Sequence, residues 1–408
     1  MKRVVVTGCG IISSLGKDWP SFRAALDEGI SGIQYMSDWD QYTGLNTRLA
    51  GPVGELQLPA HFTRKKTRSM GRVALLATLA SERALTDAGL LDDPILGSGL
   101  TGVAYGSSTG STDAAQDMVS LLINRDMGRV TATTYIRMMS HTAAVNIGVY
   151  FGLRGRVYTT SSACTSGSQG IGYAYEAIRA GQQTVMVAGG AEELCPTEAA
   201  VFDALYATST RNDAPDATPR PFDRDRDGLV IGEGAGTLIL EEREHALARG
   251  ANIHAEIVGF GTNSDGGHVT QPDSTTMQVA MELALADAGL GPAAIGHVNA
   301  HGTATDLGDV AESRATQRLF GSSQVFSGLK GHLGHTLGAC GALESWASIQ
   351  MMREGWFAPT LNLDNVDEQC GDLDYIIGAG RSLDVEHVMN NNFAFGGINT
   401  SLIFKRAE

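Results

Sequence analysis

Short apolar segments alternate with longer segments of helical period along this chain. Runs rich in Val and Ile occur at 4–6, 101–105, 157–160, 184–187, 253–258 and 295–300, and each gives way to Gly or Ser and then to a helical pattern. The segment 71–88 has a dense Ala and Leu face, and 276–288 is a second clear helix candidate. This alternation predicts an α/β fold with buried, largely parallel sheets.

Two distant parts of the chain have the same predicted order of elements. Asp87-Ala-Gly-Leu90 and Asp287-Ala-Gly-Leu290 each close a helical segment that leads into a strand and a Gly-rich turn. With 408 residues, the chain also exceeds the size at which one hydrophobic core stops growing. We therefore expect two similar halves, 1–250 with a candidate nucleophile and 251–408 with two candidate histidines.

The N-terminal run reads as a first strand that a Gly turn interrupts. It spans only about five apolar residues before Gly8, too few for the apolar region of a signal peptide. Nothing approaches the roughly 18 continuous apolar residues of a membrane helix. We expect a cytoplasmic protein without a membrane span.

Charge and cysteine usage narrow the class further. The net charge of −15 argues against a generic nucleic-acid binder, because phosphate contacts need a basic face. The five cysteines are scattered, and none has the spacing of a disulfide framework or a zinc site. We expect no disulfides and no structural metal.

The stretch 157–170 holds the candidate nucleophile. A β-branched run leads through small residues to Cys164, and a helical pattern follows. Cys164 is therefore predicted at a strand-to-helix turn, where unpaired N–H groups and the helix dipole favour a thiolate, lower the thiol pKa and can hold an oxyanion. The alternative is a small buried cysteine that only fills space.

Two histidines share the context of a strand end beside Gly. His301 follows the run 295–300, and His335 follows the run 324–326 and precedes another helical stretch. Such positions face a cleft where strands terminate, although either ring could instead cap a turn. His332 forms an H-x-x-H pair with His335, but Gly331 and Gly334 disfavour the helix that a metal pair needs.

Two further motifs resemble known binding loops without matching them. The acidic run at 223–228 resembles the start of an EF-hand loop, yet its twelfth position is Gly234 rather than Glu. The GEGAG segment at 232–236 lacks the spacing of a dinucleotide fingerprint, and its glycines are better suited to close packing of strands.

Together these segments resemble the elongating β-ketoacyl-acyl-carrier-protein synthases of type II fatty acid synthesis. The matching motifs are SSAC at 161–164, AGGAEELC at 188–195, RPFDRDRDG at 220–228, GEGAG at 232–236, NAHGTAT at 299–305, LKGHLGH at 329–335 and NNFAFGGIN at 391–399. The resemblance implies the thiolase fold, with two similar halves in a five-layered αβαβα arrangement, and usually a dimer.

The resemblance also implies a role for each catalytic residue. Cys164 accepts an acyl group from an acyl-carrier-protein thioester, and His301 and His335 assist decarboxylation of a malonyl thioester. Lys330 and Glu312 match supporting charged residues that would fix the orientation and protonation of the histidines. No metal or organic cofactor is implied, because the carrier brings its own phosphopantetheine arm.

Substrate-binding positions follow from the same motifs. Thr303 and Thr305 match residues that hydrogen-bond the phosphopantetheine arm, and Phe395 matches a gating aromatic whose N–H completes an oxyanion hole with that of Cys164. Thr109, Phe202, Leu229 and Phe393 match positions around the acyl pocket. Leu229 stands where many relatives carry Phe, and Ala394 replaces a usual Gly, so we expect an altered acyl chamber.

A basic segment matches the place where the family binds its carrier. Arg64, Lys65, Lys66, Arg68 and Arg72 lie in a stretch without acids. Arg125 and Arg129 are further candidates. An acidic carrier would be steered towards such a patch.

Several alternatives stay open. A thiolase needs a second catalytic cysteine in the C-terminal loop, but Cys340 and Cys370 lie elsewhere in the sequence. A chain-length-determining partner usually lacks the nucleophile, which is present here. The chain is therefore expected to elongate fatty acids or related polyenes or polyketides, as a homodimer or as a heterodimer with a related ketosynthase-like subunit.

Overall fold

The two halves of one eleven-stranded sheet join edge to edge at the centre of the protein. The computed structural model describes residues 1–407, and its main sheet has the strand order β13-β11-β10-β15-β16-β9-β1-β8-β6-β4-β5. β1 (Val4–Ser13) and β9 (Ala255–Ser264) pair antiparallel through Val4, Val5 and Val6. The first half of the chain supplies the strands on one side of this seam, and the second half supplies those on the other.

The strands that flank the seam have the following bounds. In the first half they are β4 (Thr101–Gly106), β5 (Val157–Thr160), β6 (Val185–Glu192) and β8 (Gly234–Glu242). In the second half they are β10 (Ile295–Asn299), β11 (Val325–Ser327), β13 (Asp374–Tyr375), β15 (His387–Ala394) and β16 (Ile398–Arg406). All six apolar runs coincide with strands, although three of them extend one or two residues beyond the strand: 184–187, 253–258 and 295–300.

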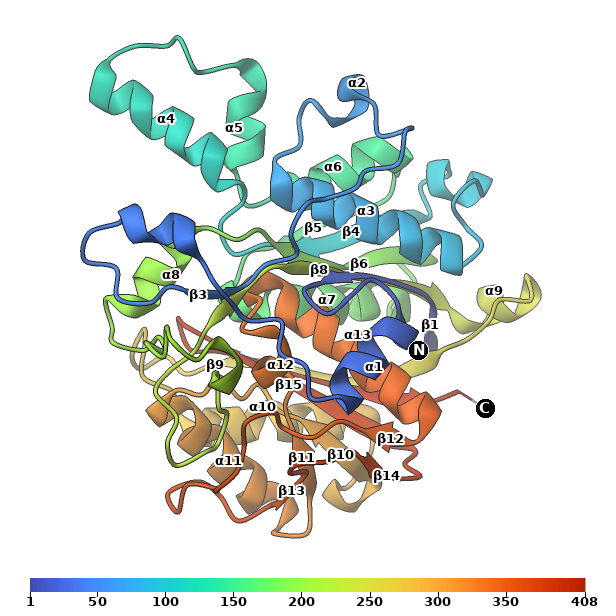
Figure 1. The fold of residues 1–408 in the computed structure, drawn as a ribbon. Coiled ribbons are helices and arrows are strands. Elements are labelled where there is room, and N and C mark those ends of the chain that lie inside the picture. The colour runs from blue at the N-terminus through green and yellow to red at the C-terminus, as the bar shows by residue number, and fades with distance from the viewer. Residues whose placement is uncertain (408) are drawn as a thin grey trace.

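Helices cover both outer faces and fill the space between the sheets (Figure 1). The outer layers are α3 (Arg72–Asp87) with α6 (Thr142–Phe151), and α10 (Ser274–Ala288) with α11 (Asp306–Phe320). The central layer is α7 (Ser166–Arg179) and α13 (Cys340–Glu354). The expected five-layered αβαβα arrangement is therefore confirmed.

Shorter elements connect these layers. They are α1 (Trp19–Asp27), β2 (Gln34–Tyr35), β3 (Leu49–Gly51), α2 (Arg64–Thr67), α4 (Thr112–Asn124), α5 (Ala132–Met138), η3 (Ala163–Thr165), α8 (Pro196–Asp203), β7 (Ile231–Gly232), α9 (Arg243–Ala248), α12 (Lys330–Leu333), η6 (Leu337–Ala339), β12 (Trp356–Phe357) and β14 (Arg381–Ser382). α4 and α5 form an arm that projects from the body (Figure 1). Within residues 1–407, no helix has the length and apolarity needed to cross a membrane.

The packing of a helix on a glycine-containing strand is repeated in the two halves. A Cβ at Gly8 would lie 2.2 Å from the Ala84 carbonyl oxygen, and one at Gly259 would lie 2.3 Å from that of Ala284. The expectation that Gly8 ends the first strand is thus wrong, because β1 continues to Ser13 with α3 lying directly against its glycines.

The two Asp-Ala-Gly-Leu motifs also act alike. Each strand has a bulge two residues before the contact, and Asp87 accepts the N–H of Cys9 while Asp287 accepts that of Phe260. These matched contacts give the internal repeat a structural basis. The division at residue 250 stays a prediction.

The sheet is mixed, which corrects the expectation of largely parallel sheets. β4 pairs parallel with β5 and β6, but β1–β8, β6–β8 and β15–β16 are antiparallel pairs. Antiparallel neighbours need no crossover helix, and a short turn at 395–397 joins β15 to β16. Apolar runs buried on both faces do not reveal strand direction.

Candidate active site

Cys164 lies at the strand-to-helix turn that the sequence predicts. It sits in η3, between the end of β5 and the start of α7, and is 4% exposed. The preceding Ala163 has φ +50°, a left-handed conformation that a residue with a Cβ adopts only when its surroundings enforce it. The turn therefore holds the thiol in one direction, towards the histidines.

His335 is the nearest side-chain partner of the thiol. Its Nε2 lies 2.9 Å from Cys164 Sγ. The backbone on both sides of this ring is fixed, since His335 N donates to Val230 O and Gly232 N donates to His335 O. The thiol and the imidazole are thus hydrogen-bonded before any substrate enters.

The thiol pKa moves opposite to the sequence-based expectation. Burial raises the pKa of Cys164 to about 12, although Lys330 and the backbone N–H groups of Phe395 and Cys164 lower it. The thiol of Cys164 is therefore protonated and would need a base to act as a nucleophile, rather than being a thiolate stabilised by the helix terminus. The two N–H groups lie beside the sulfur, where they could also reach the carbonyl oxygen of an acyl group bound to it.

Alkylation of Cys164 by iodoacetamide is expected to accelerate about tenfold per pH unit, without a plateau, from about pH 7 to about pH 10. The reason is that the thiolate fraction rises in proportion to hydroxide concentration while pH stays below the raised pKa. Peptide mass mapping separates Cys164 from the other four cysteines. A plateau below about pH 8 would contradict the expectation and restore the helix terminus as the dominant influence.

His301 is held at its backbone by Glu312. The carboxylate accepts the N–H of His301 at 2.6 Å and that of Gly302 at 2.8 Å. Burial raises the pKa of Glu312 to about 8 despite these bonds. Glu312 therefore supports His301 through the main chain, whereas the sequence suggested a direct effect on the rings.

Two obligate donors determine which nitrogen of His301 carries the proton. Lys330 Nζ lies 3.2 Å and Asn392 Nδ2 lies 3.5 Å from His301 Nδ1. Ammonium and amide nitrogens only donate, so Nδ1 accepts and the neutral ring bears its proton on Nε2. Burial, then Lys330 and His335, hold the pKa of His301 well below its usual range, so the ring stays neutral.

Lys330 forms a buried ion pair with Glu344. Their side chains are 1% and 2% exposed, and Glu344 also accepts Asn392 Nδ2 at 2.7 Å. Burial by itself would lower the pKa of Lys330. Glu344 and other acidic groups near Lys330 outweigh burial, so the Lys330 pKa is raised. Burial and this cation in turn hold the pKa of His335 well below its usual range.

Sequence reasoning missed Glu344 and Asn392. An acid inside the apolar pattern of α13 was the available signal for Glu344, and the Asn run at 390–392 was the signal for Asn392. The glycines around His332 disfavoured a helix, but His332 lies in the one-turn helix α12; this helix ends before His335, and His332 Nδ1 lies 3.0 Å from Ile30 O.

Cys164, His301 and His335 have ligand atoms within 4.8 Å of one another, close enough for a metal ion. The charged Lys330 beside them opposes a cation. It also leaves Nε2 of His301 protonated, without a lone pair for a metal. The geometry therefore favours proton transfer and anion binding over metal binding.

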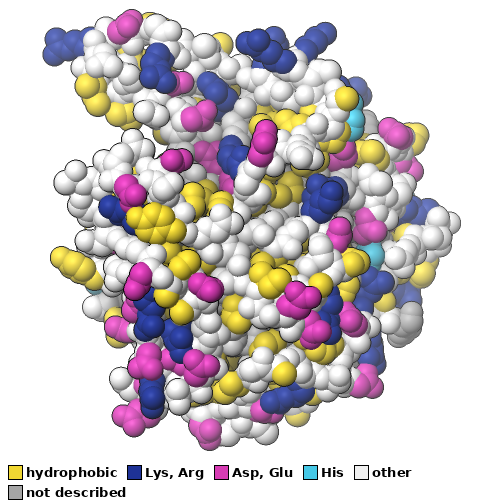
Figure 2. Space-filling view, in the orientation of Figure 1, with side chains coloured by type: hydrophobic (Ala, Val, Ile, Leu, Met, Phe, Trp, Pro, Cys, Tyr) yellow, Lys and Arg dark blue, Asp and Glu magenta, His cyan; other side chains and the backbone are white. Residues whose placement is uncertain are grey.

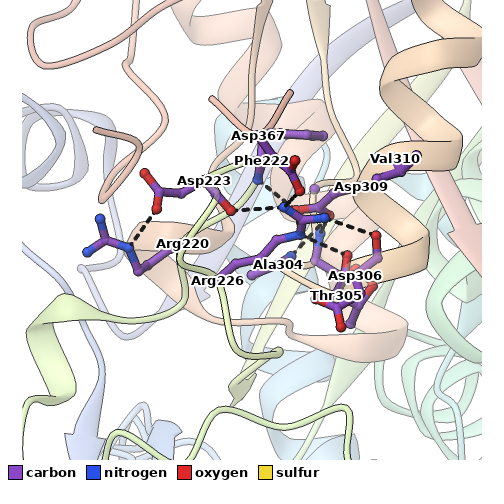
Figure 3. A network of polar contacts seen from close by, with 12 residues as sticks. Arg220, Phe222, Asp223, Arg226, Ala304, Thr305, Asp306, Asp309, Val310 and Asp367 are labelled. Carbon is purple, nitrogen blue, oxygen red and sulfur yellow. Dashed lines mark hydrogen bonds and ion pairs between the residues drawn. The ribbon is translucent and has the colours of Figure 1, made fainter. Parts of the chain in front are cut away.

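The acidic run that resembles an EF-hand loop supports the loop after His301 (Figure 3). Arg226 donates to the carbonyl oxygens of Thr305 and Asp306 and pairs with Asp367 at 2.6 Å. Asp223 accepts the N–H groups of Asp225, Asp364 and Asn365, so its carboxylate is fully used. The motif therefore positions the backbone of the loop after His301 and does not form a calcium-binding loop.

Asp309 completes this support from α11. It accepts the N–H groups of Phe222, Thr303 and Ala304. Figure 3 shows Asp309 and Arg226 converging on the same turn. The loop that bears His301 is thereby clamped by buried charges on one side and Glu312 on the other.

A cavity of about 450 Å³ opens onto the thiol. Among the candidates it is lined by Cys164, His301, His335, Glu312, Thr303, Thr305, Phe202, Leu229, Phe393 and Phe395. Thr303 Oγ1 and Thr305 Oγ1 lie 2.9 Å apart, and the Phe202 and Phe395 rings are 5.1 Å apart. Thr109 does not line this cavity; it is exposed, and its Oγ1 lies 3.4 Å from Glu198 Oε1.

The basic candidates divide into two groups. Arg64, Lys65, Lys66 and Arg68 are exposed on and beside α2, and Figure 2 shows Lys and Arg side chains gathered along that edge and on the arm. Arg72 instead pairs with buried Glu233 and donates to Gly54 O, which removes it from the free basic surface. Arg129 pairs with Asp117 at 2.9 Å, and Arg125 ends α4.

The doubled fold and the buried cysteine place the chain among the thiolase-like enzymes. Family models for the Beta-ketoacyl synthase N-terminal and C-terminal domains match residues 1–246 and 254–364. The chain belongs to the β-ketoacyl synthase family.

Full-length relatives agree with this family. The chain is 40% identical to 3-oxoacyl-[acyl-carrier-protein] synthase 2 of Vibrio harveyi over 99% of both proteins. It superposes on a Beta-ketoacyl synthase from Burkholderia phymatum with TM-score 0.99 at 59% identity, covering 100% of both chains. The Xenorhabdus doucetiae ketosynthase ApeO, solved in complex with its chain length factor ApeC, gives TM-score 0.85 at 27% identity over 100% of this chain and 98% of that chain.

Proposed function

We propose that this protein is a 3-oxoacyl-[acyl-carrier-protein] synthase in which Cys164 carries the acyl chain. The observation that carries the proposal is the 2.9 Å contact between Cys164 Sγ and His335 Nε2 in a cavity that His301 also lines. A thiol, a base and an anion-binding donor meet there, and condensation needs all three.

Acyl transfer comes first. Cys164 Sγ attacks the thioester carbonyl while its proton passes to His335, and the N–H groups of Cys164 and Phe395 stabilise the tetrahedral oxyanion. The intermediate collapses by breaking the bond to the carrier thiol, which leaves with the proton from His335. The product is an acyl thioester on Cys164.

Condensation follows with a malonyl thioester. Loss of carbon dioxide leaves an enolate, whose oxygen accepts a hydrogen bond from Nε2–H of His301. The enolate carbon attacks the acyl carbonyl, and Cys164 leaves as a thiolate. A proton taken up from solvent after product release restores the thiol beside His335. Lys330 keeps His301 in the donating tautomer throughout, and the buried walls exclude water.

Intact-mass measurement after incubation with octanoyl-acyl-carrier protein is expected to show one octanoyl adduct on the wild-type protein and none on Cys164→Ala. The adduct forms because the thiol is the nucleophile of the first step. Cys340→Ala is the matched control, since Cys340 is also buried and its Sγ lies 3.2 Å from Cys164 O. An adduct that survives Cys164→Ala would refute the proposal.

The acyl carrier protein is the proposed partner. The exposed cations of α2 and the arm support this docking in a chain whose net charge is otherwise negative. Thr303 and Thr305, whose hydroxyls line the cavity, suit the polar phosphopantetheine arm. The cytoplasmic location stays a prediction.

We also propose that two ketosynthase-like subunits pair through β5. This strand ends the main sheet, with Val157 54% exposed, and Val149 beside it is 76% exposed. Leu122 and Ile123 on the arm are 77% and 73% exposed.

Native mass spectrometry of the protein alone is expected to give a dimer, because an open apolar sheet edge favours pairing. A monomer that dimerises only with a related subunit would instead support the heterodimer and a polyketide or polyene pathway, as with ApeO and its chain length factor.

A further inference from the structure

α8 carries a buried carboxyl group without a cationic partner. Glu198 is 6% exposed, and its Oε1 accepts one long hydrogen bond, 3.4 Å from Thr109 Oγ1. Its Oε2 is buried and has no hydrogen-bond partner among the described residues. The side chains that act on it, Glu192, Cys195 and Glu193, are all acidic groups that raise its pKa, and only the backbone N–H of Cys195 acts in the opposite direction.

These surroundings keep Glu198 neutral. Burial, followed by the repulsion of Glu192 and other neighbours, raises its pKa well above the ordinary range. A neutral carboxylic acid offers an O–H donor, and here that donor is unused. Buried polar groups in folded proteins are nearly always satisfied, so an unused donor points to a missing partner.

Glu198 does not itself line the cavity, but it lies next to a residue of α8 that does. It is one helical turn before Phe202, on the same face of α8, and Phe202 lines the cavity. The next residue, Ala199, belongs to the apolar cluster that includes Cys164 and Leu229. Glu192 affects the pKa values of both Cys164 and Glu198, so a single carboxyl lies within electrostatic range of the nucleophile and of this group.

We infer that Glu198 is a specificity-determining residue whose carboxylic acid hydrogen-bonds an oxygen on the acyl chain beyond Phe202. The favoured substrates are acyl thioesters that carry a ketone or hydroxyl remote from the thioester, in preference to saturated alkyl chains. A methylene placed against the buried O–H leaves that donor unpaired, whereas a chain oxygen satisfies it. This inference rests on the proposed function, since it requires the acyl chain on Cys164.

The test measures the rate of acyl transfer to Cys164 from carrier proteins loaded with butyryl, octanoyl, 5-oxooctanoyl or 7-oxooctanoyl groups. Wild-type protein is expected to prefer one of the oxo chains over octanoyl at least about tenfold. Glu198→Leu is expected to abolish or reverse that preference, and Glu198→Gln, which keeps a donor, is expected to retain part of it.

The four carriers together separate the two proposals. Absence of transfer of all four chains by the wild-type protein would refute the proposed function itself. Equal rates for octanoyl and both oxo chains in the wild type would overturn the role of Glu198 alone. A Glu198→Leu variant whose transfer rate falls by the same factor for every chain, or whose native mass changes, would also overturn it, because Glu198 would then have a structural role only. If that variant does not fold, the preference of the wild-type protein and its reduction in Glu198→Gln decide.

Discussion

Replacing His301 with Ala is expected to lower condensation about 10²–10³-fold while acylation of Cys164 survives. The structure separates the two steps, since His335 contacts the thiol and His301 faces the cavity with Nε2–H. Removing His301 deletes the donor to the enolate oxygen but leaves the thiol, its base and the two backbone N–H groups. Intact mass reports the acyl adduct, and release of carbon dioxide from malonyl-carrier protein reports decarboxylation.

His335→Ala provides the contrast. It removes the ring bonded to Cys164 Sγ, so both acylation and condensation are expected to slow. If His301→Ala abolished acylation as strongly as His335→Ala did, the division of labour between the two histidines would be wrong.

Lys330→Met is expected to destabilise the protein by about 3–5 kcal/mol as well as to inactivate it. The substitution leaves the carboxyl of Glu344 buried without its cation, beside Asn392 as its remaining partner. It also removes the charged donor at His301 Nδ1. Chemical denaturation measures the stability, and the condensation assay measures the activity.

The loss of stability caused by Lys330→Met is expected to be smaller at acid pH. Burial already raises the pKa of Glu344 above its ordinary 4.5, and loss of Lys330 raises it further. A carboxyl with a raised folded pKa stabilises the fold below its unfolded pKa, and this stability is lost as pH rises through the folded value. Lys330→Met combined with Glu344→Gln is the matched control, which should recover stability without activity. Full stability in the single variant at neutral pH would show that the pair contributes little.

The active-site residues differ in how far the sequence could identify them. Cys164 and His301 follow strands, and His301 and His335 stand beside glycines, so short local patterns mark all three in the sequence. Glu344 lies in α13 outside the matched motifs, and Asn392 lies in β15 within the motif at 391–399, but only the packing of the central layer brings both to the site. Arg72 belongs by sequence to a basic run, yet a residue 161 positions away, Glu233, decides its role.

The pKa of Cys164 likewise could not be predicted from the local sequence. The local turn correctly indicated N–H groups around the sulfur, but burial is a property of the whole fold, and its effect on the Cys164 pKa outweighs theirs. Glu198 is a further case, since nothing in its local sequence marks it as buried and unpaired.

By itself, the sequence determined the alternating elements, the internal repeat, the family and the three candidate catalytic residues, because periodicity and short motifs are local properties. Only the tertiary structure decided the antiparallel strands at the centre, the protonation of Cys164 and His301, and the partners of Lys330. These depend on contacts between residues far apart in the chain and on the exclusion of water, which sequence spacing does not encode.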